Sequence, residues 1–338
     1  MTSVAPAAAG DARMKEATPT LLGLRRVFAR QEVSLLLVVL AIGFVASLRS
    51  PLFLTHSNIL QVLEGSVIYF VMACGSALLV IGGGLDFSVG ATFTLGGLVT
   101  AKLLASGVPV PFAILIGLSI CVVVGAVNYC VITYWHVPPI IATLGVFYVL
   151  VGVTTQLTDG LDVVPLPYEF ELLAQSSVAG IPNTVIFAVL AGLATWFLLE
   201  HTAFGVNIRA LGGNRGAAIG NGLPVARLDF AVYAAAAITA GAAGILYASR
   251  VGSGQVNAGG ATSTLMVITA VLIGGVSLLG GLGSIQGVAI GSVLLSLIDN
   301  ALVLTRVPPT YNSIIIGAIL VGAVALDHLR RVRLYRRR

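Results

Sequence analysis

The chain has 338 residues, of which 57% are hydrophobic and 9% are charged, and its formal net charge is +5. Soluble proteins carry roughly 25% charged residues, and the mean hydropathy of this chain is +1.02. We therefore predict an all-α, polytopic transmembrane helical bundle. Because each crossing helix takes about 20 residues, the chain has room for about ten spans and none for a soluble enzymatic domain. Any energy source must then be a gradient or a separate subunit.

Residues 1–32 precede the first apolar stretch and contain five of the eighteen basic residues. No small-residue cleavage site stands near the start of the apolar stretch, which argues against a signal peptide. We expect these residues to form a retained cytoplasmic tail.

Apolar stretches occupy most of residues 33–327, which we predict to be the transmembrane domain. Glycine runs near residues 84–88 and 281–284 mark short breaks between neighbouring stretches. The ten predicted spans are residues 33–49, 66–83, 88–106, 111–134, 138–157, 183–200, 228–249, 264–280, 285–304 and 311–327.

The positions of the basic residues predict how this bundle is oriented in the membrane. Three lie between the sixth and seventh spans, in residues 201–227, and six lie in the tail of residues 328–338. Because Lys and Arg concentrate in cytoplasmic loops, we expect both termini and residues 201–227 to be cytoplasmic, with six spans before that loop and four after it. The basic tail could bind nucleic acid, but directly after an apolar span we interpret it as an anchor on anionic membrane lipid and expect no nucleic-acid partner.

Between the second and third predicted spans, the sequence GGGLDFSVG places Asp86 beside Ser88. A carboxylate left in hydrocarbon is costly, so Asp86 should meet N–H groups, a cation or water. One interpretation is that Asp86 caps the helix that starts near Ser88. The other is that Asp86 is a pathway or hinge residue, together with Gly84, Ser88 and Gly90.

Residues 158–182 form an external loop in this topology. The loop could receive an external partner such as a solute-binding protein, or it could simply be solvated, and both interpretations stay open. Its acidic residues are Asp159, Asp162, Glu169 and Glu171.

The polar segment of residues 201–227 interrupts the apolar second half of the chain. Asn214 is a good helix N-cap, and Asn221-Gly222 before Pro224 is a stop signal, so we predict a short helix at about residues 214–221. Two helical turns rise about 12 Å, too little to cross a bilayer. The helix would be a rigid projection at the membrane surface, which suits contact with another protein.

Four motifs in this chain are shared with one known family. The first is L-G-G-N-x-x-A-A-x-x-x-G-[ILV], and the others are GLDFSVG at residues 84–90, RVGSGQVNAG at 250–259 and LIGGVSLLGGLGSIQG at 272–287. Together they resemble the monosaccharide (ribose, xylose, galactofuranose type) ABC-transporter permeases over nearly the whole chain after residue 33. The first motif matches the cytoplasmic coupling loop of that family, at Leu211, Gly212, Gly213, Asn214, Ala217, Ala218, Gly222 and Leu223.

The resemblance implies a permease subunit of a bacterial ABC importer in the inner membrane, which moves a monosaccharide or related polyol inward. It also implies a second copy of the chain, a cytoplasmic ATPase at the coupling loop, and a periplasmic or lipoprotein solute-binding protein outside. Arg250, Ser253 and Gln255 then belong to an external loop. The chain has no G-x-x-x-x-G-K-[ST] nucleotide site and no cysteine or histidine pair at metal-ligand spacing, so we expect neither enzymatic activity nor a metal or other cofactor.

Two departures from the family pattern concern the substrate. Where the family usually has an acidic pair, this chain has Thr264 and Met266, whereas Asp299-Asn300 stands where two amides are common. If these positions face the pathway, hydroxyl acceptors are lost at one place and a charge is added at another. Ribose itself is therefore doubtful as the substrate.

Arg215 follows the predicted cap at the start of the short loop helix. A cation there opposes the helix dipole by about 0.3–1 kcal/mol. We expect an acidic groove on the ATPase to offset this placement, with a phospholipid headgroup as the alternative.

Two other classes of protein stay open at this stage. A gradient-driven secondary transporter would explain Asp299 as a coupling carboxylate but would leave the coupling loop unexplained. An intramembrane lipid-modifying enzyme would need paired carboxylates, and Asp86 and Asp299 are far apart in the sequence.

Overall fold

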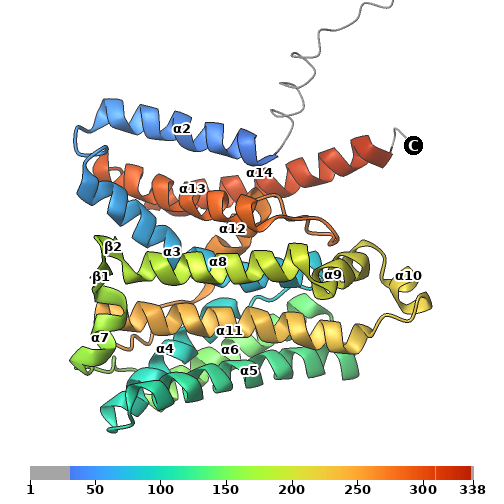
Figure 1. Cartoon of the computed structure of the whole chain (residues 1–338), viewed down its shortest axis with the longest axis horizontal. Coiled ribbons are helices and arrows are strands. Elements are labelled where there is room, and N and C mark those ends of the chain that lie inside the picture. The colour runs from blue at the N-terminus through green and yellow to red at the C-terminus, as the bar shows by residue number, and fades with distance from the viewer. Residues whose placement is uncertain (1–30, 309, 336–338) are drawn as a thin grey trace, which may run out of the picture.

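The computed structural model describes residues 31–308 and 310–335, and the predicted N-terminal tail lies outside this range except for its last two residues. Long helices lie side by side along the longest dimension of the molecule (Figure 1). The elements are α2 (Gln31–Arg49), α3 (His56–Ile81), α4 (Val89–Ala105), α5 (Val110–Tyr134), α6 (Pro139–Leu157), α7 (Tyr168–Gln175), β1 (Ser177–Val178), β2 (Ile181–Pro182), α8 (Asn183–His201), α9 (Ala203–Gly213), α10 (Arg215–Gly220), α11 (Val225–Val251), α12 (Ala261–Ile273), α13 (Ile285–Leu304) and α14 (Thr310–Tyr335).

The two ends of the bundle carry different elements. Helix α7 and the small β1–β2 hairpin lie at one end, and α9 and α10 lie at the other, on the left and right of Figure 1. We call these the α7 end and the α10 end. Helix α2 starts at the α10 end and α14 finishes there (Figure 1), so both limits of the described chain lie on the side of the predicted coupling loop.

Helix α11 is the centre of the packing, in contact with α3, α4 and α5. The face that it buries consists mostly of small residues, which let transmembrane helices approach closely. A Cβ on Gly96 of α4 would lie 2.7 Å from the Cα of Gly241, and a Cβ on Gly244 would lie 1.9 Å from the carbonyl oxygen of Phe93. These glycines therefore set the distance between α4 and α11. The buried small residues of α11 include Ala236, Ala237, Ala240, Gly241, Ala243 and Gly244.

Within the described part of the chain, seven helices are long and apolar enough to cross a membrane: α2, α3, α5, α6, α8, α11 and α13. Helices α4 and α12 are apolar but shorter, with 17 and 13 residues. At 1.5 Å per residue, α12 is about 20 Å long, less than the roughly 30 Å thickness of a hydrocarbon core.

The predicted span at residues 264–280 is wrong at both ends. Helix α12 begins at Ala261 and ends at Ile273, and the chain then turns through glycines with positive φ, among them Gly275 at 89° and Gly280 at 81°. Only glycine adopts such angles without strain, so the apolar run that suggested a longer helix is in fact a loop.

The prediction that the second span begins at residue 66 is also wrong, because α3 begins at His56. The polar residues in its first turns kept these turns out of an apolar window, but Asn58 and Glu64 have partners inside the bundle. The Arg250 guanidinium lies 2.9 Å from Glu64, and Asn58 and Asn300 exchange two side-chain hydrogen bonds.

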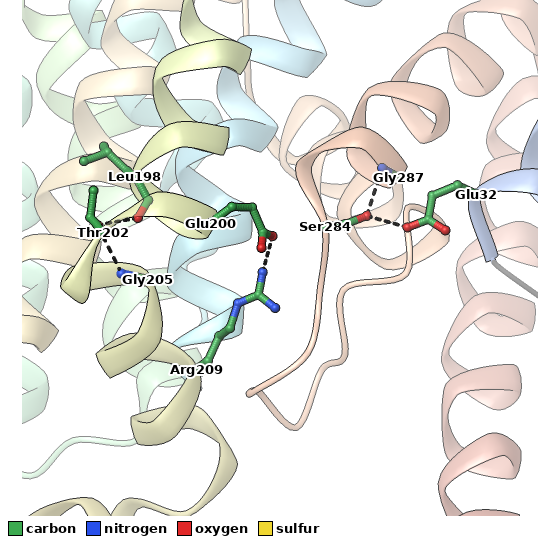
Figure 2. A network of polar contacts seen from close by, with 8 residues as sticks. All are labelled: Glu32, Leu198, Glu200, Thr202, Gly205, Arg209, Ser284 and Gly287. Carbon is green, nitrogen blue, oxygen red and sulfur yellow. Dashed lines mark hydrogen bonds and ion pairs between the residues drawn. The ribbon is translucent and has the colours of Figure 1, made fainter.

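Residues 201–227 contain two helices where the sequence predicted one. The predicted helix at 214–221 corresponds to α10, and α9 precedes it. At the corner between α8 and α9, the Thr202 hydroxyl accepts a hydrogen bond from the Gly205 N–H, and Arg209 pairs with Glu200 (Figure 2). A Thr at a helix start is a cap signal that the sequence analysis did not use.

Figure 2 also shows how the start of α2 is held: the Ser284 hydroxyl, which caps α13 by accepting from the Gly287 N–H, donates to the Glu32 carboxylate at 2.9 Å. The helix of the predicted last span continues to Tyr335, so the backbone of the basic tail is helical up to that residue.

The close approach at Gly244 makes a testable prediction. Gly244→Ala should lower the free energy of unfolding by about 1–3 kcal/mol, the usual cost of overpacking, because the new methyl meets backbone on α4. Gly145→Ala in α6 is the matched control, since nothing lies within 4 Å of a Cβ there.

The measurement is thermal unfolding of the purified variants in detergent. A Gly244→Ala variant with the same Tm as Gly145→Ala would contradict the packing described for α11.

Candidate functional site

Asp86 lies in the break between α3 and α4, where it is 6% exposed. Its Oδ1 accepts hydrogen bonds from the Ser88 backbone N–H at 2.7 Å and from the Ser88 hydroxyl at 2.6 Å. The prediction that Asp86 caps the following helix therefore needs a correction. Ser88 is the N-cap of α4, and Asp86 fixes that residue instead of binding N–H groups inside the helix.

Asn128 of α5 completes this polar cluster, and the sequence analysis missed it. Its amide nitrogen donates to the Ser88 hydroxyl at 2.8 Å and to the second oxygen of Asp86 at 3.3 Å. The available signal was an amide inside an otherwise apolar helix, because buried polar side chains in spans are rare and need partners.

Two further threonines tie the break to neighbouring helices. Thr143 of α6 accepts from the Phe87 N–H at 3.0 Å. Thr264 of α12 accepts from the Gly90 N–H at 3.1 Å and donates to the Phe87 carbonyl at 3.3 Å. The segment is thus fastened on three sides, by α5, α6 and α12.

The motif glycines in this break lie where a side chain would have little room, and at Gly90 the obstacle is backbone. A Cβ on Gly84 would lie 2.5 Å from a Leu79 methyl carbon, and one on Gly90 would lie 2.3 Å from the Gly260 carbonyl oxygen. Thr264 and Met266, which replace the acidic pair of the family, are both buried, Thr264 in the contacts above and Met266 in the hydrophobic core. Both side chains therefore contribute to the packing of α12 against its neighbours.

A cavity of about 350 Å³ lies elsewhere, between α3, α11 and α13. Asp299 and Asn300 both line it, and so does Arg250, which was predicted to lie in an external loop but belongs to the last turn of α11. The candidate pathway residues therefore fall into two groups: Asp299 and Asn300 face a cavity, while Gly84, Asp86, Ser88 and Gly90 are not among the residues that line it. The other polar lining residues are Gln61, Tyr69, Tyr247, Ser263 and Ser296.

The remaining external-loop residues support the wall of this cavity. The Gln255 side chain accepts a hydrogen bond from the Tyr247 hydroxyl at 3.1 Å. Ser253 is buried, and its N–H closes the end of α11 by donating to the Ala248 carbonyl at 3.2 Å. Glu64, the partner of Arg250, was missed because the predicted span began after it.

The glycines of the predicted coupling loop pack against two other segments at the α10 end. A Cβ on Gly212 would lie 1.9 Å from the Ile81 carbonyl oxygen, at the end of α3, and one on Gly281 would lie 2.9 Å from the Cα of Gly213. The Gly281 N–H donates to the same Ile81 carbonyl at 2.8 Å. The Gly212-Gly213 pair is therefore a point of backbone contact between α9, α3 and the α12–α13 loop.

The next residues of the motif build α10. The Asn214 side chain accepts from the Ala217 N–H at 3.0 Å, which is the cap expected from the sequence, and Ala218 is buried beneath the helix. Gly222 follows the helix with φ at 74°, a conformation that favours glycine.

Arg215 has a partner within the chain, which corrects the idea that the ATPase or a lipid must supply one. Its guanidinium donates to both oxygens of Asp229, at 3.2 and 2.5 Å. The carboxylate beside it raises the pKa of Arg215. Asp229 lies in the first turns of α11, so this ion pair joins α10 to the central helix, and a lone carboxylate at the start of an apolar span was the signal for it.

The Asp86 cluster generates a prediction about stability. Asp86→Asn keeps the oxygen that binds Ser88 and should be milder than Asp86→Ala, which leaves the Ser88 donors without an acceptor at a cost of about 1–3 kcal/mol. Thermal unfolding of both variants in detergent measures the difference. Equal Tm values for the two variants would mean that the acceptor role described here is not what Asp86 contributes.

Comparison with known proteins adds to this geometry. Residues 58–324 match the model of the family described as branched-chain amino acid transport system / permease component. Two relatives are the D-allose transport system permease protein AlsC of Escherichia coli K12, 34% identical with 87% of this chain and 90% of that protein covered, and the ribose import permease protein RbsC of Bacillus subtilis 168, 35% identical with 84% and 88% covered.

The galactose/methyl galactoside import permease protein MglC of Salmonella typhimurium LT2 is 32% identical, with 90% of this chain and 96% of that protein covered. No solved structure matches the chain. The family match spans most of the chain and agrees with the apolar helices and with the four motifs. The chain is a multi-pass membrane protein that belongs to the branched-chain amino acid transport system permease family.

Proposed function

We propose that this chain is the permease subunit of a bacterial ABC importer in the inner membrane and that it carries a monosaccharide or related polyol inward. The observation that carries the proposal is α10, a helix of 6 residues held outside the long helices at one end of the bundle by a cap, a buried alanine and an ion pair. Allose, ribose and galactose in the names of the relatives support a monosaccharide as the substrate.

The α10 end is the cytoplasmic side in this proposal. It holds Arg209, Arg215 and Arg227, together with the start of α2 and the end of α14 (Figure 1), and basic residues favour the cytoplasmic side. The seven long helices, α4, α14, and α12 extended by the loops on either side of it then supply the ten crossings, with both termini inside.

The partners follow from this orientation. The coupling residues, from Gly212 to Gly222, would receive a cytoplasmic ATPase, because the chain has no nucleotide site of its own. The α7 end, where residues 158–182 carry four acidic side chains, would receive the periplasmic or lipoprotein solute-binding protein. A second copy of the chain would complete the pathway, and the basic tail would lie against membrane lipid.

Uptake of radiolabelled sugar by vesicles tests this function. We expect uptake in vesicles that hold the permease, its ATPase and its binding protein to require ATP and to persist when the pH gradient is dissipated. Uptake driven by a pH gradient with no ATPase present would overturn the proposal in favour of a secondary transporter, for which Asp299 would be the coupling carboxylate.

The Arg215–Asp229 pair generates a second prediction, on coupling. Arg215→Asp should lower substrate-stimulated ATP hydrolysis by the assembled transporter, because it places two carboxylates together and releases α10 from α11. The double variant Arg215→Asp/Asp229→Arg should recover most of the loss. A partly exposed ion pair contributes only about 0.2–1 kcal/mol, so the single variant should still insert and fold.

Copurification of the ATPase with each variant is measured in parallel. If the charge-swapped double variant recruits the ATPase no better than Arg215→Asp, Arg215 acts on the ATPase directly and the internal pair is not the functional contact.

A further inference from the structure

A groove of about 570 Å³ lies between α4, α5 and α6, and it shares no lining residue with the cavity at Asp299. All but two of its lining residues are leucine, isoleucine or valine, and the two exceptions are Lys102 and Ser106. Val123 and Val153 in its wall are 59% and 42% exposed. The groove therefore opens on the outer surface of the chain, has an aliphatic wall and is polar at one end.

The polar end of the groove lies at the α7 end of the bundle. Lys102 is in the last turn of α4, and its neighbour Ala101 packs in one hydrophobic cluster with Phe170 of α7. From Leu95 to Ser106, the limits of the groove on α4, the chain rises about 16 Å. Half of a hydrocarbon core of roughly 30 Å is about 15 Å, so the groove has the depth of one leaflet.

Lys102 brings a positive charge to the mouth of the groove. Its ammonium group donates to the Leu157 carbonyl at the end of α6, one of the helix-end carbonyls that have no partner within their own helix. That carbonyl is neutral, and no carboxylate among residues 31–308 and 310–335 forms an ion pair with Lys102. The side chain is exposed and an ammonium has three donors, so Lys102 can still bind an anion.

The two ends of the groove call for different chemistry in one ligand. A free sugar or a free phosphate ion would leave the aliphatic wall uncovered, whereas a phospholipid brings an acyl chain and a phosphate together. The Ser106 hydroxyl donates to the Lys102 carbonyl at 2.9 Å, and its oxygen can accept from a hydroxyl of the headgroup. Charge complementarity favours an anionic headgroup, because a zwitterionic one carries a cation of its own.

We propose that the groove between α4, α5 and α6 is a binding site for one anionic phospholipid of the leaflet at the α7 end, with an acyl chain between the helices and the headgroup phosphate on Lys102. The site does not depend on which solute the protein carries. It also lies at the opposite end of the bundle from the basic tail, so the two lipid contacts are separate.

Quenching of a local tryptophan by brominated phospholipid tests the site in the full-length protein. Trp135 and Trp196 are first replaced by Phe. The reporter is then Val153→Trp in the groove wall or, as the matched control, Phe187→Trp on α8. Val153 lies four residues before the end of α6 and Phe187 four residues after the start of α8, and they are 42% and 41% exposed.

Each reporter protein is reconstituted in phosphatidylcholine vesicles with increasing fractions of brominated phosphatidylglycerol or brominated phosphatidylcholine. A basic residue near a membrane surface favours anionic lipid by about 1 kcal/mol. We therefore expect phosphatidylglycerol to bind about fivefold more tightly than phosphatidylcholine at the Val153→Trp reporter, and the two lipids to quench the Phe187→Trp reporter equally.

Charge variants test the role of Lys102 at the Val153→Trp reporter. Lys102→Gln keeps a donor for the Leu157 carbonyl but removes the charge, so it should abolish the preference for phosphatidylglycerol. Arg49→Gln removes an exposed cation from the last turn of α2, at the same end of the bundle (Figure 1). This control should keep the preference, and thermal unfolding establishes that each variant is folded.

Equal quenching by the two lipids at the Val153→Trp reporter would overturn the inference, and this comparison needs no charge variant. An equal preference at the Phe187→Trp reporter, or a preference that survives in folded Lys102→Gln, would overturn it as well. Quenching by neither lipid would mean that another protein surface, such as a second copy of the chain, covers the groove. If Val153→Trp does not fold, Val123→Trp is the reporter and the same outcomes apply.

Discussion

Backbone-to-backbone contact along α11 is the constraint on which this structure depends. In a bilayer, lipid chains are as apolar as leucine, so helices associate through close van der Waals contact and hydrogen bonds. Glycines on both sides of the α4–α11 contact, Gly96 and Gly97 facing Gly241 and Gly244, make that contact possible. Because α11 also touches α3 and α5, the position of this helix determines where the break at Asp86 and the cavity at Asp299 can lie.

The helical bundle, most helix positions and helix α10 were predicted from the sequence, because they depend on local signals: long apolar runs, the Asn214 cap, and Gly222 followed by Pro224. The sequence analysis misplaced a helix boundary where polar residues of one helix have partners on another helix. Helix α3 extends through Asn58 and Glu64 because partners on α13 and α11 bind them. It also failed at α12, where the apolar run continues into a loop that depends on positive-φ glycines.

The candidate site was predicted only in part, because the contacts that define it also join different helices. The motifs located Asp86 and Arg250, and a departure from the family pattern located Asp299. Neither could separate a polar cluster that anchors a helix break from side chains that line a cavity. The partners that make this distinction, Asn128 for Asp86 and Glu64 for Arg250, come from other helices. Arg215 shows the same limit, since Asp229 lies in a different element and is close only after folding.

The two ion pairs of α11 have a mechanical consequence. Asp229 ties its first turns to α10, and Arg250 ties its last turn to α3 beside the cavity. The helix has 27 residues, which makes it about 40 Å long. If a helix of this length tilts by about 5° about one end, its other end moves by about 3.5 Å. That displacement is roughly the length of one hydrogen bond. A small displacement of α10 would therefore be carried along this rigid helix to the α7 end, where Arg250 lines the cavity.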